Sequence, residues 1–95
     1  MKIGCPREIK PQEFRVGMTP NAAAEAIING HEVVIETNAG VGSGFEDDAY
    51  RAVGAVILDT AEEVFATADM IVKVKEPQAG ERKMLREGQL LFTYL

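Results

Sequence analysis

Short apolar runs alternate with helix-forming stretches along the chain. The apolar runs are rich in Val, Ile and Leu, which is typical of strands, and they span residues 2–5, 31–37, 55–58, 70–77 and 89–95. The stretches between them carry helix-start and helix-stop residues and predict helices over residues 22–28, 47–53, 60–67 and 80–87. This alternation predicts an α/β fold: a Rossmann-like, doubly wound parallel sheet of about five strands with helices on both faces.

Capping residues indicate where two of these helices begin and where one ends. Thr19 followed by Pro20 is typical of an N-cap and the first helical position. Thr60 and Glu63 have the spacing of a capping box. Gly30 suits the left-handed conformation that follows a helix, so we expect the first helix to end just before it.

The fourth apolar run, MIVKVKEP at residues 70–77, carries two lysines. Lys73 and Lys75 are two positions apart, so both side chains leave an extended chain by the same face. One explanation is an edge strand with a solvated face, or lysines that reach out at the sheet end. The other is a ligand site, because ligands of open α/β sheets bind beyond the carboxyl ends of the strands, where Lys75 lies.

The segment after the first strand, residues 7–18, is irregular and rich in charge. Connections at this place in an α/β unit are usually short, and long ones tend to be functional. The length of the segment therefore favours a functional role. Its charged residues are Arg7, Glu8, Lys10, Glu13 and Arg15.

A glycine-rich turn at residues 38–44 follows the second strand. Gly40, Gly42 and Gly44 form G-x-G-x-G, whereas the dinucleotide fingerprint is G-x-G-x-x-G on the first βα turn. The spacing and the position both differ, so we expect no cofactor-binding residue in this chain. Glycines here are better explained by positive φ angles and close backbone approach.

The last run, residues 89–95, is apolar and aromatic. A strand of this composition is expected to be buried on both faces, yet nothing follows to cover it. We interpret the sequence as a chain cut short at its C-terminus, with the Leu95 carboxylate on the same rim as Lys75.

Composition narrows the class of protein. Ninety-five residues, 46% of them hydrophobic and 26% charged, allow one domain. A net charge of −5 argues against binding to nucleic acid or an anionic membrane, and no apolar run approaches the roughly 20 residues of a membrane span. The single cysteine fits a reducing compartment, so we expect a cytoplasmic protein.

The other chemically active residues favour structure over function. His31 has no partner at ligand spacing and is expected at the surface, whereas Cys5 is expected to be a small buried apolar group. The acidic residues are scattered along helix starts, so no metal site is predicted.

Four segments together resemble the N-terminus of bacterial alanine dehydrogenases: KIGCPREIKPQEFRVGMTP, GHEVVIETNAGVGSGF, DMIVKVKEPQ and EGQLLFTYL. That family interconverts L-alanine and NAD with pyruvate, ammonia and NADH. The resemblance implies that residues 1–95 are the N-terminal part of the catalytic, substrate-binding domain. It also implies that the NAD-binding domain is absent from this chain, and that the complete enzyme is a homo-oligomer, often a hexamer.

The resemblance implies two site residues. Arg15 of EFRVG matches the arginine that holds the pyruvate carboxylate, and Lys75 of KVKEP matches the lysine that contacts the substrate's carbonyl or amine. Both residue types suit these roles, because the arginine fork binds carboxylates bidentately and a lysine can polarise a ketone or exchange a proton. Without the resemblance, the sequence leaves open that Arg15 has only a structural role, in a surface ion pair with Glu13 or Glu8. Lys73 is expected to be structural.

The family's catalytic histidine would follow directly after Leu95. The chain alone is therefore predicted to be inactive. Two alternatives stay open: the N-terminal region of a proton-translocating transhydrogenase α subunit, which shares the opening and layout, and a stand-alone module that binds a 2-oxo acid.

Overall fold

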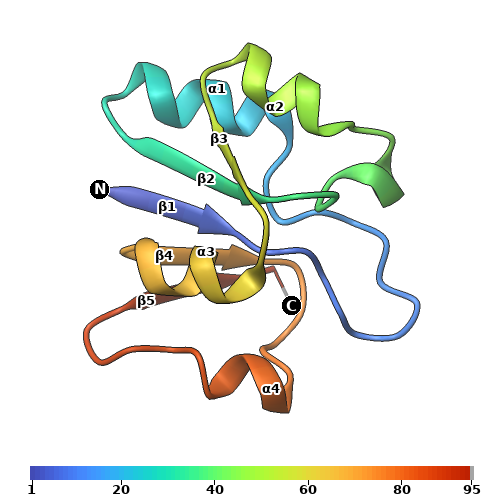
Figure 1. The fold of residues 1–95 in the computed structure, drawn as a ribbon, viewed down its shortest axis with the longest axis vertical. Helices are drawn as coiled ribbons and strands as arrows, with labels where there is room; N and C mark the ends of the chain where they lie inside the picture. The colour runs from blue at the N-terminus through green and yellow to red at the C-terminus, as the bar shows by residue number, and fades with distance from the viewer. Residues whose placement is uncertain (95) are drawn as a thin grey trace.

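Five parallel strands form one sheet in the computed structural model, which describes residues 1–94. The strands are β1 (Lys2–Cys5), β2 (Glu32–Glu36), β3 (Val56–Leu58), β4 (Met70–Lys73) and β5 (Leu90–Thr93). Their order across the sheet is β3-β2-β1-β4-β5 (Figure 1). The chain moves outward from β1 to β3 and then returns past β1 to β4, so the winding direction reverses between these two central strands. The predicted doubly wound fold is confirmed.

Helices cover both faces of this sheet (Figure 1). They are α1 (Pro20–Ile28), a 3₁₀ turn η1 (Val41–Ser43), α2 (Asp47–Ala52), α3 (Ala61–Thr67) and α4 (Ala79–Arg82). The predicted caps are present, since the hydroxyl oxygens of Thr19 and Thr60 each accept a backbone N–H bond of 3.2 Å, from Ala22 and Glu63. Gly30 has a φ of +91°, as predicted for the residue after a helix. No helix among residues 1–94 is long and apolar enough to cross a membrane.

Two apolar cores hold the layers together. Alternate residues of the central strands face α1 and α2, and this core includes the buried side chains of Ile3, Cys5, Val33, Ile35 and Tyr50. The opposite face packs against α3 through Val34, Val64, Phe65, Ala68 and Ile71. The two helical layers bury the middle of the sheet and leave the strand ends free to carry polar groups.

Close approach between α3 and β1 explains why β1 contains a glycine. A Cβ atom on Gly4 would lie 2.7 Å from the Ala68 Cβ and 2.8 Å from Val64 Cγ1. Both distances are shorter than real carbon–carbon contacts, so only glycine fits without repacking α3.

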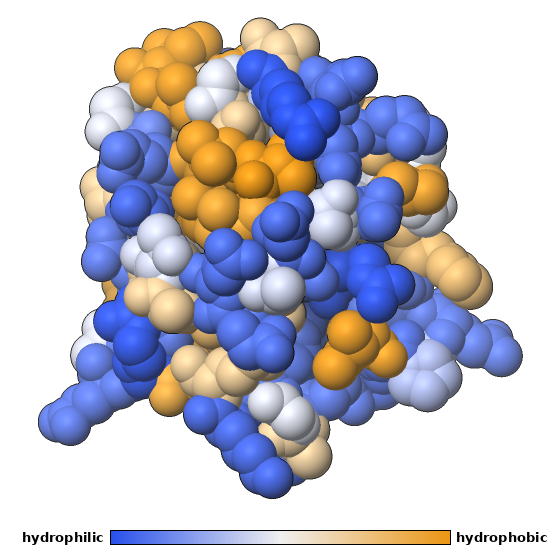
Figure 2. Space-filling model, in the orientation of Figure 1, coloured by the Kyte–Doolittle hydropathy of each residue, from blue (hydrophilic) through white to orange (hydrophobic). Residues whose placement is uncertain are grey.

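The edges of the sheet are less covered than its centre. Leu90 and Phe92 of the edge strand β5 are 53% and 49% exposed, so the expected burial on both faces is wrong for the described residues of this strand. Leu95 lies outside the described residues. At the opposite edge, Val56 of β3 is 55% exposed, and Figure 2 shows apolar side chains gathered over this part of the molecule.

The helix predicted over residues 80–87 is also partly wrong, because α4 ends at Arg82. Beyond it, the side chains of Arg86 and Gln89 donate hydrogen bonds to the carbonyl oxygens of Phe65 and Ala68 at the end of α3. These contacts draw the chain away from a helical path and toward the start of β5.

Candidate functional site

The reversal of winding places the ends of β1 and β4 side by side, and this is where open α/β sheets bind ligands. Residues 6–19 leave the carboxyl end of β1, and residues 74–78 leave the carboxyl end of β4. The first segment contains Arg15 and the second contains Lys75. The two residues singled out in the sequence therefore lie on the two connections that border this point.

Lys73, at the end of β4, belongs to a buried ion cluster. Its Nζ atom lies 3.0 Å from Glu8 Oε1 and 3.1 Å from Glu81 Oε2, and all three side chains are at most 2% exposed. The cluster joins the segment after β1 to β4 and α4. A buried charge requires such partners. This arrangement favours the expected supporting or structural role of Lys73. The alternative of a solvated edge is wrong, because β4 lies between β1 and β5.

Glu8 also fixes the backbone next to Lys75. Its carboxylate accepts hydrogen bonds from the backbone N–H groups of Val74 (2.9 Å) and Lys75 (3.3 Å). Lys75 is only partly buried, and its ammonium group forms no ion pair with a carboxylate of residues 1–94. Lys75 thus combines a fixed backbone with an available positive charge.

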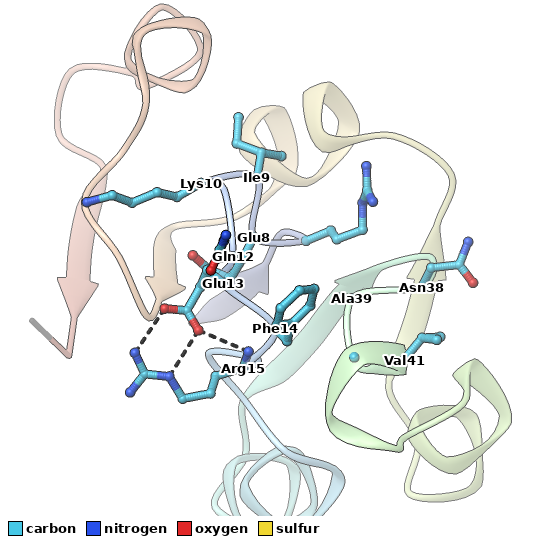
Figure 3. Close-up of a pocket in the computed structure, with 12 residues that line it drawn as sticks. Glu8, Ile9, Lys10, Gln12, Glu13, Phe14, Arg15, Asn38, Ala39 and Val41 are labelled. Carbon is cyan, nitrogen blue, oxygen red and sulfur yellow. Dashed lines mark hydrogen bonds and ion pairs between the residues drawn. The ribbon is translucent and has the colours of Figure 1, made fainter.

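Arg15 forms a forked ion pair with Glu13 (Figure 3). Its Nε atom donates to Glu13 Oε2 and its Nη2 atom donates to Oε1, both at 2.9 Å, while its backbone N–H donates to Oε2 at 3.0 Å. The Arg15 side chain is 66% exposed, whereas that of Glu13 is 6% exposed. The surface ion pair considered from the sequence is therefore present, and the guanidinium still faces solvent.

The electrostatics of this pair connect it to Lys75. Hydrogen bonds from Arg15 lower the pKa of the Glu13 carboxyl from 4.5 to about 2, and the charge of Lys75 adds a smaller contribution in the same direction. The same pair raises the pKa of Arg15. Both cations therefore act on one carboxylate, and Glu13 stays ionised at neutral pH.

Two cavities of about 410 Å³ each border Arg15. The first lies between the segment after β1 and the turn after β2 (Figure 3). The second is more apolar, with Ala22, Phe45, Val74 and Tyr94 among the residues that line it. Arg15 lines both cavities, whereas Lys75 lines neither, although its neighbour Val74 borders the second.

The glycine-rich turn supports the segment that carries Arg15. A Cβ atom on Gly40 would lie 2.7 Å from the Tyr50 hydroxyl oxygen, and one on Gly42 would lie 2.7 Å from the carbonyl oxygen of Phe14. The Ser43 hydroxyl donates to that same carbonyl at 3.0 Å. The predicted close backbone approach is confirmed, and its partner is the residue directly before Arg15.

The roles of Glu8 and Glu81 were not recognised in the sequence. A signal existed, because a lysine within an apolar strand requires a buried counter-charge. The sequence does not tell which of its many carboxylates supplies that charge, since Glu8 and Lys73 are 65 positions apart.

Comparison with protein families gives a match over nearly the whole chain. The model of the family described as "Alanine dehydrogenase/PNT, N-terminal domain" matches residues 4–95. The chain belongs to this family. The resemblance seen in the sequence is thereby confirmed.

The relatives of this chain include both alanine dehydrogenases and a transhydrogenase subunit. The chain is 54% identical over 95 residues to alanine dehydrogenase of Methanococcus maripaludis and 50% identical to that of Mycobacterium tuberculosis. It is 48% identical over 94 residues to NAD(P) transhydrogenase subunit alpha of Cereibacter sphaeroides. All or nearly all of the chain is covered in each case, but only 26%, 26% and 18% of the respective relatives.

Solved structures of both kinds have the same fold. An L-alanine dehydrogenase superimposes over the whole chain with a TM-score of 0.96 at 47% identity, and a transhydrogenase from Sinorhizobium meliloti does so with a TM-score of 0.92 at 32% identity. The chain covers 26% and 27% of these structures. It therefore corresponds to about a quarter of each.

Proposed function

We propose that this chain is the substrate-binding part of an NAD-dependent alanine dehydrogenase, which converts L-alanine, NAD and water to pyruvate, ammonia and NADH. The observation that carries the proposal is the pair of available cations, Arg15 and Lys75, on the two segments that leave the carboxyl ends of β1 and β4. Family membership and about 50% identity to alanine dehydrogenases support the reaction type. On this proposal the complete protein is cytoplasmic and homo-oligomeric.

The two cations have different tasks in this proposal. Arg15 binds the substrate carboxylate, since its guanidinium is permanently charged and offers parallel N–H donors. Lys75 donates to the carbonyl oxygen of pyruvate, which makes the carbonyl carbon more electrophilic, and it can hold or exchange a proton there. Neither task requires the buried Lys73, whose charge is used by Glu8 and Glu81.

The chain's own glycine-rich turn does not fit a dinucleotide. Tyr50 fills the space that a Cβ atom on Gly40 would need, and Phe14 fills that beside Gly42, so packing within the chain accounts for these two glycines without a bound pyrophosphate. We therefore propose that NAD binds mainly to a domain outside these 95 residues. The hydride transfer that NAD supplies is outside what these residues can perform.

A transhydrogenase α subunit is the second candidate. It is favoured by the 48% identity to the Cereibacter sphaeroides subunit and by the structural likeness to the Sinorhizobium meliloti protein. The two candidates differ in whether a 2-oxo acid takes part in the reaction.

An assay of the complete protein that carries this chain separates the two candidates. We expect NADH oxidation that requires both pyruvate and ammonia, and NAD reduction that requires L-alanine. Hydride transfer between NADH and an NADP analogue, with no requirement for pyruvate, would instead identify a transhydrogenase. The isolated 95-residue chain is predicted to show neither activity. Pyruvate-dependent NADH oxidation by this chain would reject the proposal that NAD binds mainly outside these residues.

A further inference from the structure

The Glu13–Arg15 pair uses only part of the guanidinium group. Glu13 binds the edge formed by Nε and Nη2, with two bonds of 2.9 Å. The edge that carries Nη1 receives no bond from Glu13, and the Arg15 side chain remains 66% exposed beside the two cavities. A guanidinium has five N–H donors. One carboxylate bound to Nε and Nη2 therefore leaves N–H groups on Nη1 and Nη2 for a second carboxylate.

Glu13 is itself held firmly enough to serve as a support. Its side chain is 6% exposed, and its Oε2 atom accepts a bond from the backbone N–H of Arg15 as well as one from the side chain. The two residues are two positions apart, so this arrangement is formed within a single short segment. The glycine-rich turn supports that segment through the hydrogen bond from the Ser43 hydroxyl to the Phe14 carbonyl oxygen.

We propose that Glu13 is a positioning residue, which holds the Nε edge of Arg15 so that the Nη1 edge is presented to the carboxylate of the substrate. This inference rests on the proposed role of Arg15 and adds Glu13 to the site. An unsupported arginine samples many rotamers, and ordering it on binding costs affinity. Glu13 removes that cost before the substrate arrives.

The opposite arrangement makes a different prediction. If Glu13 competed with the substrate for Arg15, it would have to leave before binding. Three features argue against such a departure: the Glu13 side chain is little exposed, it accepts a bond from the Arg15 backbone N–H, and it binds only the edge formed by Nε and Nη2. A competitor would also be expected to occupy the exposed end of the guanidinium.

The test uses Glu13→Gln and Glu13→Ala in the complete protein, with kcat and the KM for pyruvate as readouts. We expect the KM to rise about tenfold in Glu13→Ala, which corresponds to one charge-assisted contact, and less in Glu13→Gln, whose amide oxygen can still accept one N–H. We expect kcat to change less than about twofold. Glu25→Gln is the matched control, because Glu25 is exposed on α1 and lines neither cavity, and it should leave both constants unchanged.

A double-mutant cycle with Arg15→Ala separates this proposal from the proposed function. If Glu13 acts through Arg15, Glu13→Ala should have no further effect on KM in the Arg15→Ala background. A lower KM in the Glu13 variants would identify a competitor and overturn the proposal, and so would an unchanged KM. A kcat that falls together with the melting temperature would overturn it as well, by indicating a role in folding. An unchanged KM in Arg15→Ala itself would instead overturn the role of Arg15, and the Glu13 proposal with it.

Discussion

Two ion clusters begin in the same segment after β1, and they differ mainly in burial. Glu8 binds Lys73 inside the protein, where both side chains are at most 2% exposed. Glu13 binds Arg15 at the surface, where the arginine is 66% exposed. A buried pair is costly to break because it leaves an uncompensated charge, whereas an exposed pair contributes little to stability. Burial therefore distinguishes the structural lysine from the cation that is available to a ligand.

Removing the buried cation should have the largest effect on stability. Lys73→Met would leave the carboxylates of Glu8 and Glu81 buried without their partner, so we expect the free energy of unfolding to fall by about 3–5 kcal/mol. Urea unfolding measures this value. Lys83→Met is the matched control, because Lys83 is exposed next to α4, and it should change stability by less than about 0.5 kcal/mol. Similar small effects for both variants would contradict the claim that the buried cluster stabilises the fold.

Replacing the available lysine should affect turnover and leave stability nearly unchanged. In the complete protein, Lys75→Ala removes a proposed donor to the substrate carbonyl, and we expect kcat for pyruvate reduction to fall about a hundredfold or more. Steady-state kinetics and a thermal melt of the same variant measure both properties. Normal turnover in this variant would refute the role proposed for Lys75.

The exposed pair should have a small effect that depends on pH. Because Arg15 lowers the pKa of Glu13 to about 2, the unfolded chain takes up this proton at a higher pH than the folded chain does. The stability that the pair contributes is therefore present above pH 4.5, the ordinary value for the carboxyl, and is lost as the pH falls toward 2. Between about pH 5 and about pH 3, wild type should lose more free energy of unfolding than Glu13→Gln, which cannot titrate. Equal losses would argue against the Arg15 bond, and Glu25→Gln should behave as wild type.

Local chemistry explains which parts of the fold could be predicted from the sequence. The caps at Thr19 and Thr60 act on backbone groups three positions away, so the whole interaction is present in a short stretch of sequence. The short apolar runs that predict strands likewise consist of neighbouring residues, and they led to the correct five strands. The end of α4 could not be predicted in this way, because it depends on bonds from Arg86 and Gln89 to the distant end of α3.

The candidate site shows the same limit more clearly. Arg15 and Lys75 were predicted through the family resemblance. The irregular charged segment gave an independent reason to examine Arg15, and the position at the carboxyl end of the fourth strand gave one for Lys75. The partner of Lys73 could not be chosen from the sequence, since burial and distance between remote positions decide it. The fork between Glu13 and Arg15 was foreseen as an ordinary surface pair, but its use of a single guanidinium edge depends on side-chain geometry.

The KM for pyruvate of Arg15→Ala, measured in the complete protein beside its melting temperature, tests the central claim most directly. The account predicts a rise in KM on the order of a hundredfold, because a charge-assisted contact to the carboxylate is lost. It also predicts only a small fall in melting temperature, because the ion pair that disappears is exposed and contributes little stability. A KM within about twofold of wild type would contradict the claim that the exposed cation at the ends of β1 and β4 binds the substrate.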